Sequence, residues 1–259
     1  MVAFDPAAGR WTNHLPRNVE PEWTRKLPLA YIPRTYSALT TGSERSVMRN
    51  ATEDSPAVPR PDLNIVFDQV AYRPANHSLY YFFGGLTAQY DIARRRWRDL
   101  RPTHSPPPVV GGSLAYNPVH DEFVLFGGGH VAERTPDGVV RGYTGTWIYK
   151  VNQNDWVRLP PATEPPPRMV TRMVTDTRNN TLILFGGDSQ RHYLADTWVF
   201  DLQARAWRES KATASPEPRA GHFTAYDPQT GLVLIGGGYN RKDLANMWAY
   251  DPASDSWSQ

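Results

Sequence analysis

Residues 182–207 read LILFGGDSQRHYLADTWVFDLQARAW, and this stretch decides the fold. A short apolar run stops at the glycine pair Gly186–Gly187, a polar loop follows, and Phe200 stands seven positions before Trp207. Short runs rich in β-branched and aromatic residues that stop at glycine are typical of buried strands entering tight turns. The stretch therefore predicts β-strands joined by a polar loop.

The same order of features recurs along the chain, which indicates an internal repeat. An aromatic residue stands seven positions before a tryptophan five times, and Asp follows that aromatic residue except at Lys150. Trp156, Trp207 and Trp257 lie 51 and 50 residues apart, an interval that fits a four-stranded propeller blade. The five pairs are Phe4/Trp11, Tyr90/Trp97, Tyr149/Trp156, Phe200/Trp207 and Tyr250/Trp257.

Two hairpins are predicted in each blade, formed by strands that we call a to d from the inside outward. An early strand a ends at an Asn-Pro or Asp-Pro turn, as at 113–118 and 223–228. Strand b is an apolar run that ends in glycines, and strands c and d carry the aromatic residue and the tryptophan. The predicted fold class is therefore an all-β propeller of about four full blades. The four b runs are LYYFFGG (79–85), FVLFGGG (123–129), LILFGG (182–187) and LVLIGGG (232–238).

We expect residues 1–259 to form one domain. Its blades are predicted at 61–100, 108–159, 168–209 and 219–258, joined by proline-rich linkers. Residues 2–11 resemble a c–d hairpin, which is half a blade, and residues 12–60 form an irregular segment or a degenerate blade. We therefore expect an incomplete, open ring, in a chain that is either truncated or packs its first hairpin differently. Open blades expose apolar faces, so self-association is expected as well.

Charge and composition argue against several classes of partner. The chain has 28 Lys and Arg against 26 Asp and Glu, and its net charge of +2 is too weak to predict a nucleic-acid partner. No apolar stretch approaches the roughly 18 residues of a membrane span, and residues 1–5 lack the features of a signal peptide. There is no cysteine, so thiolate metal sites and disulfides are excluded. Localisation stays unassigned.

The order of apolar run, Gly-Gly, loop, Thr-Trp-x-aromatic and Trp resembles the kelch repeat. It occurs at 196–201 with Trp207 and in a similar form at 247–251 with Trp257, and residues 218–222 (PRAGH) are similar to the opening strand of that family. The resemblance covers residues 61–258 and the hairpin at 2–11, and it implies a kelch-type β-propeller of the galactose oxidase-like superfamily. Departures from the pattern are the short first blade, Lys150 and the segment 109–111.

The recurring residues favour a scaffold over a catalytic centre. We expect the tryptophans to pack against neighbouring blades and the Asp residues after the aromatics to accept backbone N–H groups in turns. The glycine runs lack the Lys-Ser/Thr and the helix of a phosphate loop. Asp188, His192 and His130 lie on loops without a metal-binding pattern, and Ser189 lacks the nucleophile elbow of a hydrolase. The sequence predicts no metal and no cofactor.

Binding residues are expected on the loops, because a rigid repeat presents its variable connections at one face. The b–c and d–a connections should emerge on the same side, and the b–c loops supply His130, Asp188, Arg191, His192, Asn240 and Arg241. Near the starts of the inner strands lie Arg168, Arg172, Arg219 and His222. There they would bind an anionic or polyhydroxyl ligand, or would form buried structural hydrogen bonds.

These observations favour a non-catalytic module that binds a protein, a peptide or a glycan on its loop face. The resemblance also implies an alternative, an enzyme that acts on sugars. A mutarotase-like enzyme would use acid–base groups among the four inner residues, whereas the copper oxidases of the superfamily imply a Cys-Tyr pair and this chain has no cysteine. A structural module within a larger protein is the third possibility. No catalytic residue is assigned.

Overall fold

The computed structural model of the chain describes four short strands before residue 69 and, from residue 69 onward, all residues except 95, 135–139, 144 and 161–162. For the four early strands and for residues 83, 97, 130–134 and 140–142 the description covers the backbone alone. Most of the irregular segment expected at 12–60 lies outside the described residues.

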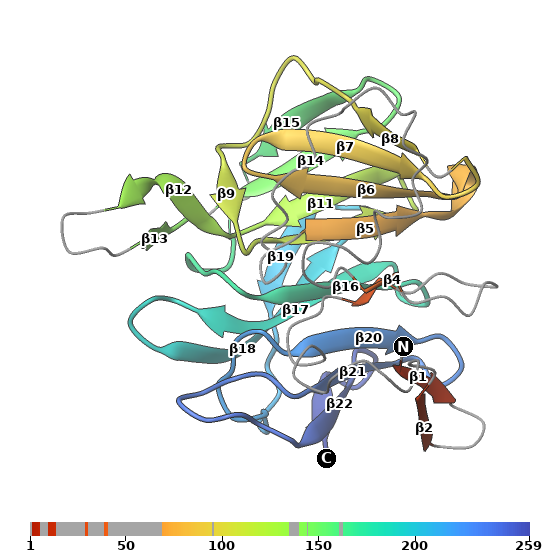
Figure 1. The fold of residues 1–259 in the computed structure, drawn as a ribbon. Helices are drawn as coiled ribbons and strands as arrows, with labels where there is room; N and C mark the ends of the chain where they lie inside the picture. Colours follow the sequence, from red (N-terminus) through yellow and green to blue (C-terminus); the bar gives the residue numbers. More distant parts are fainter. Residues whose placement is uncertain are drawn as a thin grey trace.

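Four antiparallel sheets of four strands each form a four-bladed propeller (Figure 1). Blade 1 contains β5 (Gln69–Arg73), β6 (Ser78–Phe83), β7 (Leu86–Asp91) and β8 (Arg96–Asp99), and blade 2 contains β10 (Ser113–Asn117), β11 (Glu122–Phe126), β14 (Thr146–Lys150) and β15 (Asp155–Leu159). Blade 3 contains β16 (Arg172–Asp176), β17 (Thr181–Asp188), β18 (Tyr193–Asp201) and β19 (Ala206–Glu209), and blade 4 contains β20 (Phe223–Asp227), β21 (Leu232–Gly236), β22 (Met247–Asp251) and β23 (Ser256–Ser258). The predicted all-β propeller with four full blades is confirmed.

Smaller strands lie outside the four blades. In blade 2 the b–c connection forms β12 (Gly129–Arg134) and β13 (Val140–Gly142), which pair with each other, and β12 also pairs with β9 (Val109–Val110). The hairpin of β1 (Val2–Asp5) and β2 (Arg10–Asn13) places Phe4 opposite Trp11. Tyr250 and Trp257 face each other in the same way in blade 4. A two-residue pair, β3 (Leu29–Ala30) with β4 (Leu39–Thr40), completes the described strands.

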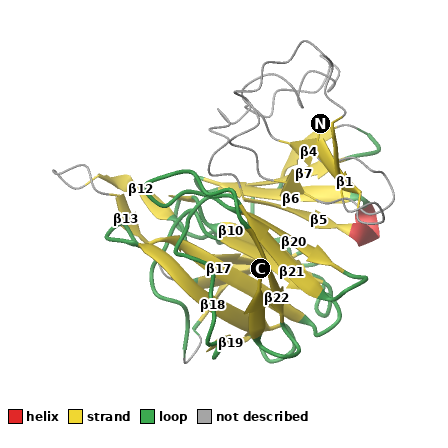
Figure 2. Ribbon diagram, turned by 90° about the horizontal axis from the view of Figure 1, so that it is seen from below, coloured by secondary structure: helices red, strands yellow, loops and turns green. Residues whose placement is uncertain are grey.

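The sheets of successive blades lie beside one another (Figure 2). The core lies in the seams between them, where apolar side chains of neighbouring blades form common clusters. The innermost strands of neighbouring blades contact one another in the order β5, β10, β16 and β20. In blades 1 to 3, consecutive residues of strand b are buried, so both faces of the strand are covered, whereas in blade 4 Leu234 between the buried Val233 and Ile235 is half-buried. This explains why the b runs are apolar throughout and do not alternate with polar residues.

Hairpin turns follow the turn chemistry that the sequence predicts. The carboxylate of Asp201 accepts the backbone N–H groups of Gln203 and Ala204 at 2.8 and 2.7 Å, and Asp91 and Asp251 accept N–H groups in the equivalent c–d turns. In blade 1 the b–c connection is only the pair Gly84–Gly85, both with positive φ, as expected for a tight hairpin turn.

The glycine pair that ends strand b lets two neighbouring blades approach closely. In blade 3, the N–H of Gly187 donates to the carbonyl oxygen of Arg219 in blade 4 at 2.9 Å. A Cβ on Gly186 would lie 2.6 Å from that same oxygen, and Gly186 has a φ of +57°. Any larger residue would therefore separate the two blades or strain the backbone.

In blades 2, 3 and 4, an indole on the outer strand joins its blade to the preceding one. Between blades 2 and 3, Trp207 of β19 donates from Nε1 to Oγ1 of Thr146, which begins strand c of blade 2, at 2.8 Å. Its ring lies between Phe126 of blade 2, with centroids 5.3 Å apart, and Phe200 of its own blade, at 4.9 Å. The same arrangement joins blades 1 and 2 through Trp156, Thr87, Phe82 and Tyr149, and blades 3 and 4 through Trp257, Thr197, Phe185 and Tyr250.

Blade 4 lacks the residues that would accept such an indole on its outward face. By strand register, Met247 occupies the place of Thr146 and Gly236 the place of Phe126. A Cβ on Gly236 would lie 2.5 Å from the ring of Phe223, so this ring covers the space beside Gly236. The Thr–Phe seat for an indole is therefore present in blades 1 to 3 and absent from blade 4.

Removal of one indole hydrogen bond should weaken one seam. The substitution Thr146→Val keeps the shape of the fully buried side chain but leaves the Nε1–H of Trp207 without an acceptor. We expect the free energy of unfolding in urea to fall by about 1–3 kcal/mol. In a double-mutant cycle with Trp207→Phe, the two losses should not add. The exposed Thr213→Val variant is the control, and an equal loss in that control would contradict the assignment.

Candidate binding site

The b–c connections of blades 2, 3 and 4 project on one face of the molecule, at the left of Figure 1. The connections of blades 3 and 4 are tight loops. In blade 3, the N–H and the hydroxyl of Ser189 both donate to the carbonyl oxygen of His192, at 3.1 and 2.8 Å. The carboxylate of Asp188 accepts the N–H of Gln190, which has a φ of +70°. These bonds close the turn and present Arg191 and His192 at its exposed tip.

The b–c loop of blade 4 is tied to the blade in a similar way. Tyr239 and Ala220 exchange two backbone hydrogen bonds at 2.9 and 3.1 Å, and the N–H of Asn240 donates to the carbonyl oxygen of Lys242 at 3.0 Å. Arg241 sits between these two residues with a φ of +58°. A left-handed conformation is uncommon for a residue other than glycine, and here it holds Arg241 at the tip of the turn.

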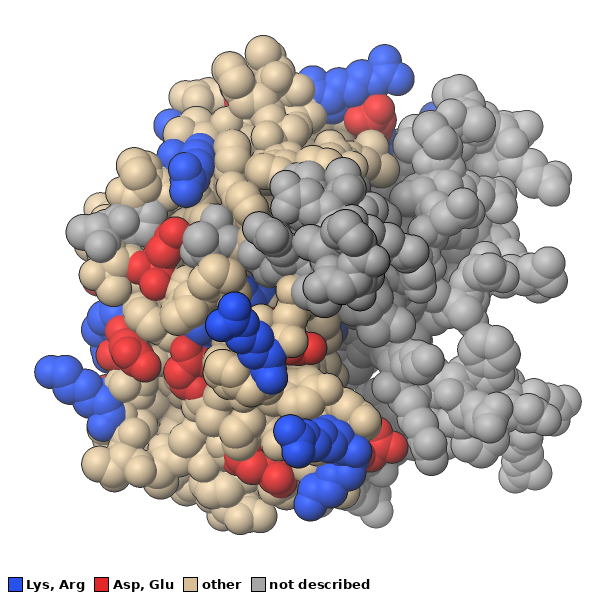
Figure 3. Space-filling model, turned by 90° about the vertical axis from the view of Figure 1, so that its left-hand side faces the viewer, with Lys and Arg blue, Asp and Glu red and all other residues tan. Residues whose placement is uncertain are grey.

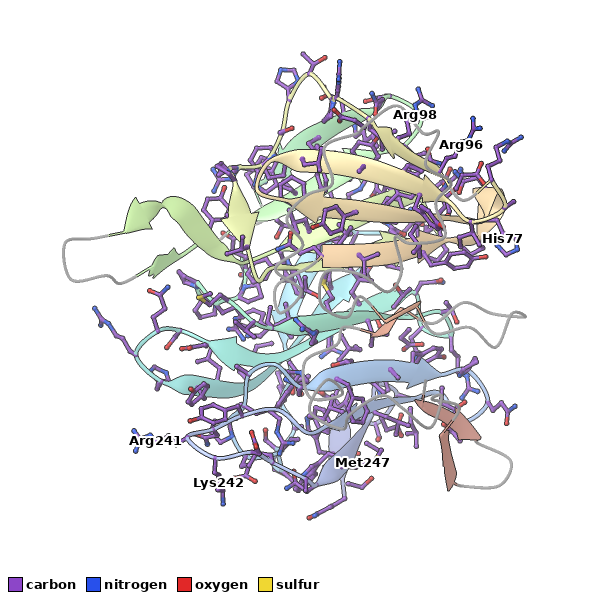
Figure 4. The ribbon with its side chains drawn as sticks, in the orientation of Figure 1. His77, Arg96, Arg98, Arg241, Lys242 and Met247 are labelled. Carbon is purple, nitrogen blue, oxygen red and sulfur yellow. The ribbon has the colours of Figure 1, made fainter. Side chains whose placement is uncertain are left out.

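A pocket of about 440 Å³ lies between these two loops. The ring of Tyr193 stands edge-on to Tyr239, with centroids 5.9 Å apart, so the aromatic pair connects the two blades beside the pocket. Figure 4 shows Arg241 and Lys242 extending outward at this end of the molecule. The pocket is lined by Arg191, His192, Tyr193, Pro218, Asn240 and Arg241.

The lining is basic and contains no acidic side chain. No ion pair of the described residues involves Arg191, Arg241 or the neighbouring Lys242. Figure 3 looks onto the loop face, where several Lys and Arg side chains lie over the lower half with Asp and Glu side chains between them. Burial, and to a lesser extent the charge of Asp188, raises the pKa of Tyr193, so its phenol remains a hydrogen-bond donor at neutral pH.

Arg168 is a buried structural residue in this fold. Its guanidinium donates to both carboxylate oxygens of Asp196 at 2.7 and 2.6 Å and to the carbonyl oxygens of Pro166 and Gly186. The indole of Trp198 donates to the same carboxylate at 2.7 Å. Arg168 therefore anchors the d–a linker to strand c of blade 3 and does not line the pocket.

Arg219 holds the equivalent place in blade 4, but its carboxylate partner is replaced. It donates to the carbonyl oxygens of Glu217 and Gly237, as Arg168 does to those of Pro166 and Gly186. At the position of Asp196 stands Asn246, and the buried Nη2 of Arg219, Oδ1 of Asn246 and Nε1 of Trp248 have no hydrogen-bond partner. The carboxylate of Glu217 lies 4.0 Å from Nη2, and burial lowers the pKa of the guanidinium.

Exchange of the acid and the amide between the two blades should shift stability in opposite directions. Asp196→Asn leaves the buried Arg168 without its counter-ion, and we expect a loss of about 3 kcal/mol in the free energy of unfolding. Asn246→Asp supplies the missing acceptor for Arg219 and Trp248, and we expect a gain of about 1 kcal/mol. Urea unfolding at pH 7 measures both changes, and destabilisation by Asn246→Asp would show that the two positions are not equivalent.

His222 is buried against blade 3 and does not reach the pocket. Its side chain is 1% exposed, its ring meets the ring of Phe185 edge-on at 5.4 Å, and neither ring nitrogen has a hydrogen-bond partner. Burial lowers the pKa of His222 well below its ordinary value, and the positive charges of Arg172 and Arg219 lower it further. The imidazole is therefore neutral in the folded protein at neutral pH.

This depressed pKa predicts acid sensitivity of the seam between blades 3 and 4. Below the ordinary His pKa of about 6.5, the unfolded chain binds a proton that the folded chain does not bind. The free energy of unfolding therefore decreases as the pH is lowered. We expect this single group to contribute up to about 1.4 kcal/mol per pH unit on acidification, until the folded pKa is reached. Urea unfolding between pH 7 and 5.5 should show a shallower slope for His222→Gln than for the wild type. The exposed His192→Gln variant controls for the loss of an imidazole, and parallel slopes in wild type and His222→Gln would contradict the prediction.

The remaining predicted residues lie in other places. Arg172 is half-buried at the start of β16 and donates to the carbonyl oxygen of Thr171 at 3.0 Å. Asp188 shapes its own loop, and His130 lies in β12 with its side chain outside the described residues. The structure thus brings together four of the predicted loop residues, Arg191, His192, Asn240 and Arg241, and adds Tyr193 and Pro218. Tyr193 and Pro218 could have been found in the sequence as an aromatic residue and a linker proline that stand beside the polar loops.

The described residues contain no group of three or more His, Cys, Asp or Glu that could hold a metal ion. They also contain no helix with the length and hydrophobicity needed to cross a bilayer.

The radial four-stranded sheets and the indole joints define a repeat β-propeller. The family described as the KLHDC2/KLHL20/DRC7 Kelch-repeats domain matches residues 74–259, and the chain belongs to this kelch-repeat family. Kelch-repeat propellers are generally protein-interaction modules. The resemblance noted in the sequence is thereby confirmed.

Similar segments occur in much longer proteins. The chain is 32% identical over 127 residues to the dynein alpha chain of the flagellar outer arm of Chlamydomonas reinhardtii, which covers 47% of this chain and 3% of that protein. It is 26% identical over 134 residues to acyl-CoA-binding domain-containing protein 5 of Arabidopsis thaliana, covering 51% and 19%. Mei4-dependent protein 6 of Schizosaccharomyces pombe is 27% identical over 134 residues, covering 47% and 18%. The chain therefore matches less than a fifth of the length of each of these relatives.

Proposed function

We propose that this propeller binds a peptide segment of a partner protein in the pocket between the b–c loops of blades 3 and 4. The observation that carries the proposal is the convergence of two rigid loops and a linker proline on one pocket of about 440 Å³. Pockets of this size are common for small ligands and short peptide anchors. The aromatic pair Tyr193 and Tyr239 adds a surface of the kind enriched in protein interfaces.

Catalysis is the less supported alternative. A mutarotase-like reaction requires acid–base groups that can reach the substrate, but Arg168, Arg219 and His222 are buried, with 0–1% of their surface exposed. The pocket itself offers one titratable imidazole, His192, and no carboxylate. Such a lining can orient and hold a ligand, and it lacks a carboxylate base.

Peptide and glycan arrays test the proposal. We expect the wild-type chain to bind a subset of peptides, and the fourfold variant R191A/H192A/N240A/R241A to lose at least about tenfold in affinity, which corresponds to the loss of one or two good polar contacts. The double variant R96A/R98A is the control, because these exposed arginines lie at the opposite end of the molecule (Figure 4). Circular dichroism should show that both variants are folded.

Two outcomes would overturn the proposal. If every detected interaction survives the fourfold substitution unchanged, the pocket is not the binding site. If glycans bind and peptides do not, the ligand class is wrong although the site is right.

A further inference from the structure

The two arginines of the pocket differ from the ion-paired arginines of the described propeller in how their charge is compensated. Arg73, Arg94, Arg101, Arg168, Arg205 and Arg208 each pair with a carboxylate of this chain within 4 Å. Arg191 and Arg241 have no such pair among the described residues. Both nevertheless line a concave site, where a guanidinium benefits most from an anionic partner.

Two acidic groups lie on the same loops, but neither lines the pocket or forms an ion pair with these arginines. Asp188 accepts the N–H of Gln190 at 2.6 Å, and Asp243 is exposed. The lining thus combines two positive charges with the amide of Asn240 and the phenol of Tyr193 as hydrogen-bond donors. All of these groups favour an acceptor that carries negative charge.

The arginines are also held apart on two separate supports. Arg191 lies in the turn that Ser189 and His192 close, and Arg241 lies in the turn between Asn240 and Lys242. One belongs to blade 3 and the other to blade 4, so a single anionic group placed in the pocket between the loops would have one arginine on either side. Because the turns already fix the backbone at both arginines, only their side chains lose conformational freedom on binding.

An apolar wall lies beside these charges. Pro218 and the ring of Tyr193 line the pocket, and Tyr239, 46% exposed, extends the wall towards solvent. A lone inorganic anion would leave this wall uncovered. An extended peptide would cover it while placing one charged side chain between the loops.

We propose that the pocket recognises an acidic side chain, a carboxylate or a phosphate, on an extended peptide, held between Arg191 and Arg241 with a neighbouring residue of the peptide against Pro218 and Tyr193. The inference rests on the proposed peptide-binding function and adds the charge requirement to it. The carboxylate and phosphate sources share the same recognition chemistry, so the experiment separates them.

The test uses three degenerate peptide libraries with identical random flanks and a central residue fixed as Glu, phosphoserine or Gln. We expect the wild-type chain to retain the Glu or the phosphoserine library about tenfold better than the Gln library, as charge-assisted hydrogen bonds predict. The variant R191Q/R241Q should lose this preference, and R241E should shift it towards a fourth library with central Lys. Preference for Glu or for phosphoserine then identifies the source of the anion.

The variant R96Q/R98Q is the matched control, since it removes the same charge from exposed positions at the far end of the molecule (Figure 4). It should keep the preference of the wild type. An equal loss in R96Q/R98Q would show that only the overall charge matters, and this would overturn the inference. Equal retention of the Gln library by the wild type would overturn it as well, yet peptide binding in the pocket would still stand if R191A/H192A/N240A/R241A abolished it. Retention of no library would overturn the inference, and the array experiment above would then decide the proposed function separately.

Discussion

The contact on which the propeller depends is the one between an outer-strand indole and the Thr–Phe seat of the preceding blade. In the three joints, the donor and acceptor residues are 60, 61 and 69 positions apart in sequence. Each joint therefore needs one full repeat of correct length between its two residues. The bond is buried, so its loss leaves an indole N–H without water or protein as a partner. Blade 4, with Gly236 and Met247 at the seat, does not continue the series in this way.

The pocket follows from the same geometry. The joint through Trp257 and Thr197 holds blades 3 and 4 together. The b–c loops of the two blades emerge next to each other at one end of this seam (Figure 1). The two loops then meet through Tyr193 and Tyr239. Below them, the same seam contains the unpaired donors of Arg219 and the neutral His222. The blade boundary with the least complete polar network is thus the one that carries the pocket.

Sequence reasoning located the loop face, and it could not separate the pocket residues from the other polar residues. Arg191, His192, Asn240 and Arg241 were expected on loops, and they do converge. Arg168 and Arg219 have the same residue type and the same polar setting in the sequence, yet each anchors its own linker to strand c. What distinguishes the two groups is burial and the position of a partner such as Asp196, and neither can be read from local sequence.

The period of glycine pairs and indoles determined, without any coordinates, that the chain is an all-β propeller with four full blades, because short apolar strands and turn chemistry are local properties. The roles of the aspartates after strand c were determined in the same way, since each carboxylate caps a turn of its own hairpin. The tertiary structure alone decided that threonines receive the indoles, that Asn246 leaves Arg219 unpaired, and that two arginines from different blades share a pocket. These features join residues from different repeats, and their distances depend on how the blades pack.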